Sequence, residues 1–219
     1  MLRALFVKTG QAVWISHLDL MRLFQRAFKR AGFALTHTQG YNPRPSVSIA
    51  LPLSVGVQSH CELLDFELEG EAVSCEEIKN RLNRALVEGV NVLEVYENGG
   101  KIKNLALLDC SVTLEYDKGI PEGAPDSITS LFYREMLVVE KKSKNGIAEQ
   151  DIIPMIRRIA VEVTDAHCLV LNARICCQNP TLNPVQLGAA IAKYLPEYTP
   201  DFVTCCRQEI YTTEETIFR

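Results

Sequence analysis

The segments LRALFVK at residues 2–8 and ISHLDLMRLFQRAFKRAG at residues 15–32 decide the fold of the first half of the chain. The first is short and mainly apolar, which predicts a β-strand. In the second, Ser16 stands at the position of a helix N-cap, and Asp19 follows three residues later. Ile15 and Leu20 can pack on each other as a hydrophobic staple. We expect this helix to run to about Arg30 and to stop at Gly32, since glycine readily adopts left-handed backbone.

Residues 33–96 continue the pattern. Alternating apolar residues at 47–51 and 64–68 predict two strands joined as a hairpin. A second capped helix begins after Ser74 and should end at Gly89, and residues 90–96 then form a strand. The order strand, helix, strand, strand, helix, strand predicts an α+β lobe of the ferredoxin-like type, with helices on one face of an antiparallel sheet.

The second half repeats this order less regularly. We expect strands at 105–116, 159–163, 167–176 and 202–211, helices from about Asp126 and at 183–195, and an insertion near 134–158 that contains a polar loop at 141–145. Asn98, Gly99 and Gly100 indicate a linker. The sequence therefore predicts two tandem ferredoxin-like lobes, residues 1–98 and residues 101–219.

Composition restricts the class of protein. The 219 residues are 47% hydrophobic and 23% charged, which suits a globular protein with a real core. No apolar run approaches the ~20 residues of a membrane helix, and the first residues lack the pattern of a secretory signal, so we expect a cytoplasmic protein without membrane contact. The eight cysteines form no C-x-x-C pair, and neighbours on a strand point to opposite faces, so we expect no metal and no cofactor.

Charge is distributed unevenly along the chain. Residues 1–50 contain a single acidic residue and carry a net charge of +6, and the remainder carries −10. A segregated charge of this kind can steer an anionic ligand or dock the protein on a partner. The seven basic residues of the first segment are Arg3, Lys8, Arg22, Arg26, Lys29, Arg30 and Arg44.

The first predicted helix carries much of this charge. Its helical spacing places Arg22, Arg26, Lys29 and Arg30 opposite an apolar stripe, with Asp19 beside them. This face is either a basic ridge that binds an anion, together with Ser16, or a solvated surface on which Asp19 merely pairs with Arg22. Both interpretations remain open.

His17 lies in the first turn of the same helix. Free backbone N–H groups there favour an anion, so His17 is a candidate for acid–base chemistry or anion binding. A histidine packed against nearby Trp14 is the alternative and the favoured interpretation. His37, His60 and His167 are isolated, and no nucleotide-binding loop or nucleophile motif is present.

The loop QGYNPRP at residues 39–45 is the third candidate. Two prolines stiffen it, so Tyr41, Asn42 and Arg44 should point in fixed directions. An aromatic ring, an amide and a guanidinium together suit a nucleotide or an exposed base, although a rigid connector whose polar side chains face water is slightly favoured for any one of these residues. We expect this loop to converge with the basic helix and His17 in one electropositive recess.

The segments FVK at 6–8, WISHLDLMR at 14–22, QGYNPRP at 39–45 and LPLSVG at 51–56 resemble the bacterial radical-SAM-linked protein family. The likeness becomes looser after about Leu68. It implies a partner, because members are similar to domains fused to or encoded beside radical-SAM proteins with a cobalamin-binding-type domain. It implies no catalytic residues. By analogy of fold alone, two such lobes resemble the RAMP superfamily of RNA-processing endoribonucleases, whose glycine-rich basic loop is replaced here by residues 196–200.

Three hypotheses follow. The leading one is a noncatalytic accessory protein that binds RNA or a nucleotide-like anion on its basic first lobe and presents it to a radical-SAM enzyme. The second is a metal-independent RNA-processing enzyme or transferase that uses His17. The third is a purely structural adaptor that needs neither site.

Overall fold

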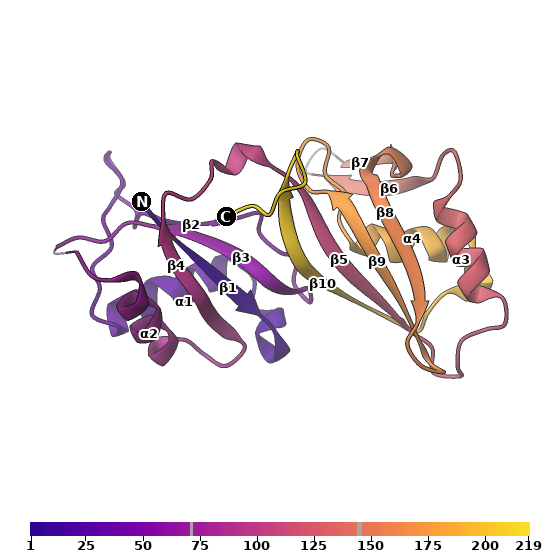
Figure 1. The fold of residues 1–219 in the computed structure, drawn as a ribbon, viewed down its shortest axis with the longest axis horizontal. Coiled ribbons are helices and arrows are strands. Elements are labelled where there is room, and N and C mark those ends of the chain that lie inside the picture. Colours follow the sequence, from indigo (N-terminus) through magenta and orange to yellow (C-terminus); the bar gives the residue numbers. More distant parts are fainter. Residues whose placement is uncertain (71, 144–145) are drawn as a thin grey trace. The chain divides into compact units, whose positions relative to one another are not determined.

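The computed structural model describes residues 1–70, 72–143 and 146–219 as a mixed α/β protein. The chain divides into two compact units, residues 1–104 with 218–219 (unit 1) and residues 105–217 (unit 2). The described residues form four α-helices, and the paired strands within each unit are antiparallel (Figure 1). Among these residues, no helix has the length and apolar character required to cross a membrane.

Unit 1 contains four strands and two α-helices. They are β1 (Leu2–Lys8), α1 (His17–Arg30), β2 (Val47–Ala50), β3 (Gln58–Phe66), α2 (Cys75–Ala85) and β4 (Val90–Glu97). β1 lies between β4 and β3, and β2 pairs with the edge of β3 that faces away from β1. Both helices lie on the same side of this sheet (Figure 1).

The core of unit 1 joins the helices to the sheet. Phe6 of β1 meets Phe24 of α1 edge-on, with ring centroids 4.8 Å apart, and Phe28 packs on Phe66 at the same separation. Such aromatic pairs add to the free energy gained by burying their area. The predicted apolar stripe of α1 is therefore the face that packs on the sheet, which leaves its arginines outside.

The predicted starts of the two helices of unit 1 are confirmed, but the predicted end of the second helix is wrong. The Ser16 hydroxyl accepts a hydrogen bond from the Asp19 N–H, and Ser74 does the same for Glu77. However, α2 ends at Ala85 rather than at Gly89, because the next residue turns to extended backbone. The role of Asn83 was not predicted: its amide donates to the carbonyl of Val92 and accepts from the N–H of Val92, so it ties α2 to β4.

Unit 2 contains six strands and two α-helices. They are β5 (Leu105–Glu115), α3 (Ala124–Phe132), β6 (Val138–Ser143), β7 (Gly146–Asp151), β8 (Ile156–Val163), β9 (Cys168–Cys176), α4 (Val185–Tyr194) and β10 (Phe202–Thr212). Its main sheet has the order β10, β5, β9, β8. β6 and β7 form a separate hairpin.

The predicted insertion has more structure than expected. The polar loop predicted at 141–145 is wrong over 141–143, which belong to β6, and 144–145 lie outside the described residues. Lys141 pairs with Ala148 across the hairpin. The alternation of apolar and polar residues is weak in these strands because much of the hairpin faces water, so the pattern did not predict them.

The two faces of the unit 2 sheet differ. On β5, Cys110, Val112 and Leu114 are buried in the core, where α4 packs on β5 and β10. Asp109 and Ser111 alternate with these residues and therefore lie on the opposite face of the sheet. This polar face is the setting of a second group of side chains described below.

Candidate functional site

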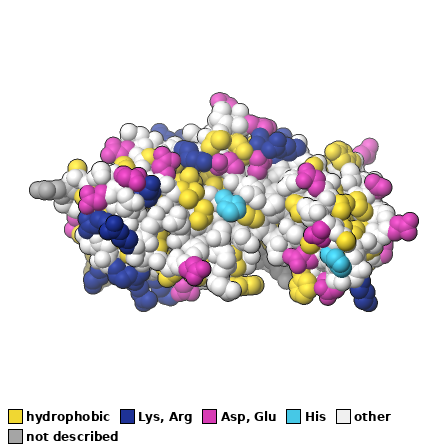
Figure 2. Space-filling model, turned by 60° about the horizontal axis from the view of Figure 1, so that its bottom comes forward, with side chains coloured by type: hydrophobic (Ala, Val, Ile, Leu, Met, Phe, Trp, Pro, Cys, Tyr) yellow, Lys and Arg dark blue, Asp and Glu magenta, His cyan; other side chains and the backbone are white. Residues whose placement is uncertain are grey.

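An arginine groove between α1 and α2 is the strongest site in unit 1. One hollow, of about 390 Å³, is lined by Ile15, Asp19, Arg22, Leu23, Arg26, Arg30 and Val87. A second, of about 350 Å³, is lined by Arg30, Ala31, Arg81, Arg84 and Ala85. Arg30 borders both hollows, so we treat them as one groove. Figure 2 shows Lys and Arg side chains gathered at the left of the view, over α1 and α2.

Among the described residues that line the two hollows, Asp19 is the only one with a carboxylate, and this carboxylate already has hydrogen-bond partners. It accepts a hydrogen bond from the Ser16 hydroxyl at 2.8 Å and one from Arg22 at 3.0 Å. These two bonds, in that order, hold the pKa of Asp19 below its ordinary value. Asp19 therefore stays ionised at neutral pH and neutralises one arginine of the groove.

The other arginines differ in what holds them. Arg30 donates to the carbonyl of Ala85 at 2.5 Å, so it joins α1 to the end of α2. Arg81 donates to the carbonyl of Ala31 and pairs with a glutamate one turn earlier. Within the described part of the chain, Arg26 and Arg84 form no hydrogen bond or ion pair. The groove thus contains uncompensated positive charge that an anionic ligand can meet.

The basic segment is less available than its charge suggests. Arg3 is buried and forms a two-bond ion pair with Asp65, with Nε to Oδ1 at 2.6 Å and Nη2 to Oδ2 at 3.0 Å. Lys8 is also buried, and its ammonium donates to the carbonyls of Val13 and Ile15. Burial lowers the pKa of Lys8, although nearby Glu62 opposes this. Two of the seven basic residues are therefore structural, whereas α2 adds Arg81 and Arg84 from outside the segment.

The stiffened loop lies at the end of β1 opposite to His17 and the first turn of α1, so the expected recess that contains both does not form. It returns beside the end of β3, since Thr36 donates to Glu67, whereas α1 starts from the opposite end of β1. The register places Leu2 beside Phe66 and Lys8 beside Ser59, so roughly 20 Å of strand separates the two ends. The Tyr41 side chain is fully exposed, and Asn42 and Arg44 are exposed beside it.

His17 is the first residue of α1 and is half-buried. Its Nδ1 atom is buried and has no hydrogen-bond partner in the described part of the chain. Asp19, the nearest carboxylate in sequence, is occupied by Ser16 and Arg22, so it does not orient the imidazole as a base. Trp14 is largely exposed rather than buried around the histidine.

No metal centre emerges from the described residues, where no three His, Cys, Asp or Glu side chains converge on one point. Five of the eight cysteines are buried. Burial raises the pKa of Cys177 and of Cys205 to about 12, so both remain thiols at neutral pH. A buried neutral thiol is a poor metal ligand or nucleophile.

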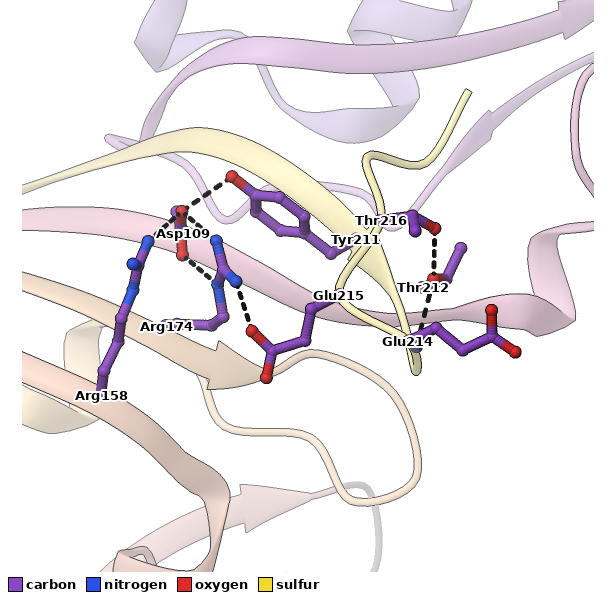
Figure 3. Close-up of polar contacts among 8 residues, drawn as sticks. All are labelled: Asp109, Arg158, Arg174, Tyr211, Thr212, Glu214, Glu215 and Thr216. Carbon is purple, nitrogen blue, oxygen red and sulfur yellow. Dashed lines mark hydrogen bonds and ion pairs between the residues drawn. The ribbon is translucent and has the colours of Figure 1, made fainter.

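Sequence reasoning missed a polar cluster in unit 2, drawn in Figure 3. Asp109 of β5 accepts two hydrogen bonds from Arg174 of β9, at 2.8 and 2.9 Å, and one each from Arg158 of β8 and Tyr211 of β10, both at 2.9 Å. Arg174 also pairs with Glu215. Burial alone would raise the pKa of Asp109, but the bonds from Arg174 and Tyr211 outweigh it and lower that pKa. The signal in the sequence was an acidic residue within the apolar first half of β5, LALLDC at residues 105–110.

The fold and the groove define a mixed α/β protein with a basic site on its helical face. The chain belongs to a family described as an uncharacterized protein conserved in bacteria (DUF2344), whose pattern matches residues 1–184. No curated protein matches the chain. A crystal structure of an unknown protein from Galdieria sulphuraria is similar at 11% identity, over 94% of this chain and 96% of that one, with a TM-score of 0.27.

Proposed function

We propose that the protein is a noncatalytic accessory factor that binds RNA, or a nucleotide-like anion, in the arginine groove of unit 1. The observation that carries this proposal is that Arg26 and Arg84 form no hydrogen bond or ion pair within the described residues and line a groove with Arg22 and Arg30, whose lining carboxylate, Asp19, is already paired with Arg22. Arginine is suited to phosphate because its planar guanidinium donates two parallel hydrogen bonds.

The spacing of the arginines favours an extended ligand. Arg22, Arg26 and Arg30 follow one another at four-residue intervals, which on a helix is a rise of ~6 Å each. A row of charges along one direction suits a phosphodiester chain better than a single phosphate. The lining contains no aromatic ring on which a base could stack, so the groove favours backbone contacts that are independent of sequence.

The finer fold assignment belongs to the same proposal. Each unit contains the order strand, helix, strand, strand, helix, strand, with the β6–β7 hairpin inserted into the second. This order supports two tandem ferredoxin-like lobes. The resemblance to radical-SAM-linked proteins supports a cytoplasmic radical-SAM partner with a cobalamin-binding-type domain. The exposed loop with Tyr41, Asn42 and Arg44 is free to contact that partner or its substrate.

The test is RNA binding measured against salt concentration. A variant with Arg22→Ala, Arg26→Ala and Arg84→Ala should bind a single-stranded RNA more weakly, with the slope of log K against log salt reduced by about 2. The control variant carries Lys101→Ala, Lys103→Ala and Arg157→Ala, exposed positions outside the groove that remove the same net charge. It should bind nearly as the original protein does.

Equal losses of RNA affinity in the two variants, or RNA binding that does not depend on salt concentration, would contradict the proposal that RNA binds in the groove. Copurification of the radical-SAM partner with a groove variant that no longer binds RNA would instead favour the structural adaptor. The enzyme hypothesis requires that His17→Ala abolish a detectable reaction on RNA while the protein stays folded. For an accessory protein, we expect the groove variant to lose RNA binding, and we expect neither the original protein nor any variant to react with RNA.

A further inference from the structure

A further hollow, apart from the two that form the arginine groove, lies on the polar face of the unit 2 sheet. It has a volume of about 380 Å³, within the size range of small-ligand pockets. Residues of four strands line it, among them Asp109, Arg158, Ala160, Asn172, Ala173 and Gln208. Nothing in the groove of unit 1 is needed to form it, so it is a separate candidate site.

Arg158 forms one side of this hollow. Its Nη2 atom donates to Asp109 at 2.9 Å, and the side chain is 64% exposed. Asp109 is itself fixed by Arg174 and Tyr211, so the carboxylate gives the guanidinium a defined direction (Figure 3). In the described part of the chain, the Nε and Nη1 atoms of Arg158 donate to no other group. Nη2 has a second N–H, which lies parallel to an N–H of either Nε or Nη1, so Arg158 keeps a pair of parallel donors beside the hollow.

Gln208 and Asn172 form another side. Gln208 is the extra residue of a β-bulge in β10, which turns its side chain onto the polar face. Its Nε2 donates to the Ser111 hydroxyl at 2.8 Å, so its carbonyl oxygen is left as an acceptor. Asn172 pairs with Ser111 in the β5–β9 register and is exposed, and its amide forms no hydrogen bond within the described residues.

The strand register sets the spacing between these groups. Asp109, Arg174 and Arg158 share one cross-strand row, and Ser111, Asn172 and Ala160 share the next row, two residues along. Two residues of a strand span about 7 Å. Donors therefore stand at one edge of the hollow and amide acceptors at another, with the small side chain of Ala160 beside the acceptors.

We infer that this hollow binds a guanine base. Guanine has two acceptors, O6 and N7, on one edge, which match the paired donors of Arg158, and N–H donors on its other edge, which match the amide oxygens of Gln208 and Asn172. Adenine has an amino group in place of O6 and would set a donor against the guanidinium. A ring in this position would lie beside the small side chain of Ala160 and the backbone of Ala173.

The test uses guanosine and adenosine as probes, with binding measured by equilibrium dialysis on the full chain. Neither nucleoside carries a phosphate, so the arginine groove of unit 1 contributes nothing to the result. Guanosine should bind at least roughly tenfold more tightly than adenosine, the size expected of one bidentate contact. Arg158→Lys, which keeps the charge and removes the fork, should abolish this preference.

Asn172→Ala is a second variant at an exposed position and should weaken guanosine binding several-fold. The matched control is Arg157→Ala, which removes a neighbouring exposed arginine that does not line the hollow. Circular dichroism verifies that each variant is folded. The inference is overturned if guanosine does not bind, if adenosine binds equally well, or if Arg157→Ala has the same effect as Arg158→Lys. It is also overturned if inorganic phosphate competes fully with guanosine, because the site would then be a simple anion site at Arg158.

Discussion

At the scale of single residues, Asp109 shows how much can depend on one carboxylate. It accepts four hydrogen bonds from three side chains, and both it and Arg174 are mostly shielded from water. Asp109→Asn would leave Arg174 without its principal counter-charge. We expect the free energy of unfolding at pH 7 to fall by about 3 kcal/mol, as for other broken buried pairs. Urea unfolding measures this loss.

The pH dependence of the same variant follows from the lowered pKa of Asp109. A carboxyl whose folded pKa lies below its unfolded value of ~3.9 stabilises the protein fully above that value and loses the effect as the pH falls through the folded pKa. The difference between the original protein and Asp109→Asn should therefore shrink as the pH is lowered from 4. Asp126→Asn, at an exposed position, is the control and should change little. A difference that stays constant down to pH 2 would contradict the ionic role.

At the scale of elements, two arginines of α2 have different roles where this helix meets α1. Arg81 donates to the carbonyl of Ala31 at the end of α1 and stacks on the ring of Phe33 at 4.1 Å. Arg84 lines the same groove without such bonds in the described part of the chain. Arg81 therefore stabilises the end of α1, whereas Arg84 is available to a ligand.

Methionine substitutions separate these roles because they keep the aliphatic stem. Arg81→Met should lower the free energy of unfolding by about 1 kcal/mol, since it removes the guanidinium that donates to the Ala31 carbonyl at the end of α1. Arg84→Met should leave unfolding nearly unchanged and weaken RNA binding. Urea unfolding and RNA titration of both variants measure the two effects. If the two variants behave alike in both measurements, the division between helix end and ligand contact is wrong.

At the scale of the whole molecule, the last two residues belong to unit 1 although they follow unit 2 in sequence. Phe218 is 2% exposed, the Arg3 guanidinium lies 5.4 Å from its ring centroid, and Gly100 donates to the carbonyl of Arg219 at 2.6 Å. The buried ion pair of Arg3 with Asp65 lies beside this contact. The C-terminal residues therefore complete the packing around β1.

Phe218→Ala should destabilise unit 1 by about 3 kcal/mol, the usual cost of removing a buried aromatic ring. Hydrogen exchange should rise in β1 and β3 and stay nearly unchanged in β5 and β9. Ile217→Ala, at the neighbouring and mainly exposed position, is the matched control and should leave exchange unaltered. Faster exchange confined to β5 and β9 would contradict the assignment of these residues to unit 1.

The amino-acid sequence by itself determined the local elements. Ser16 and Ser74 cap their helices through backbone groups three residues away, and the apolar stripe of α1 follows from helical spacing alone. Such interactions are complete within a turn of the chain, so a pattern of a few residues is enough to predict them. The exposed arginines of α1 were predictable for the same reason.

Only the tertiary structure decided which charges are available and which groups meet. Arg3 and Lys8 counted as surface charge in the sequence, but long-range packing buries them, and Arg84 reaches the groove from α2. The partners of Asp109 lie 49, 65 and 102 residues away and meet it only because β8, β9 and β10 are aligned with β5 in one sheet. Burial and strand register depend on the whole sheet, so no local pattern contains them.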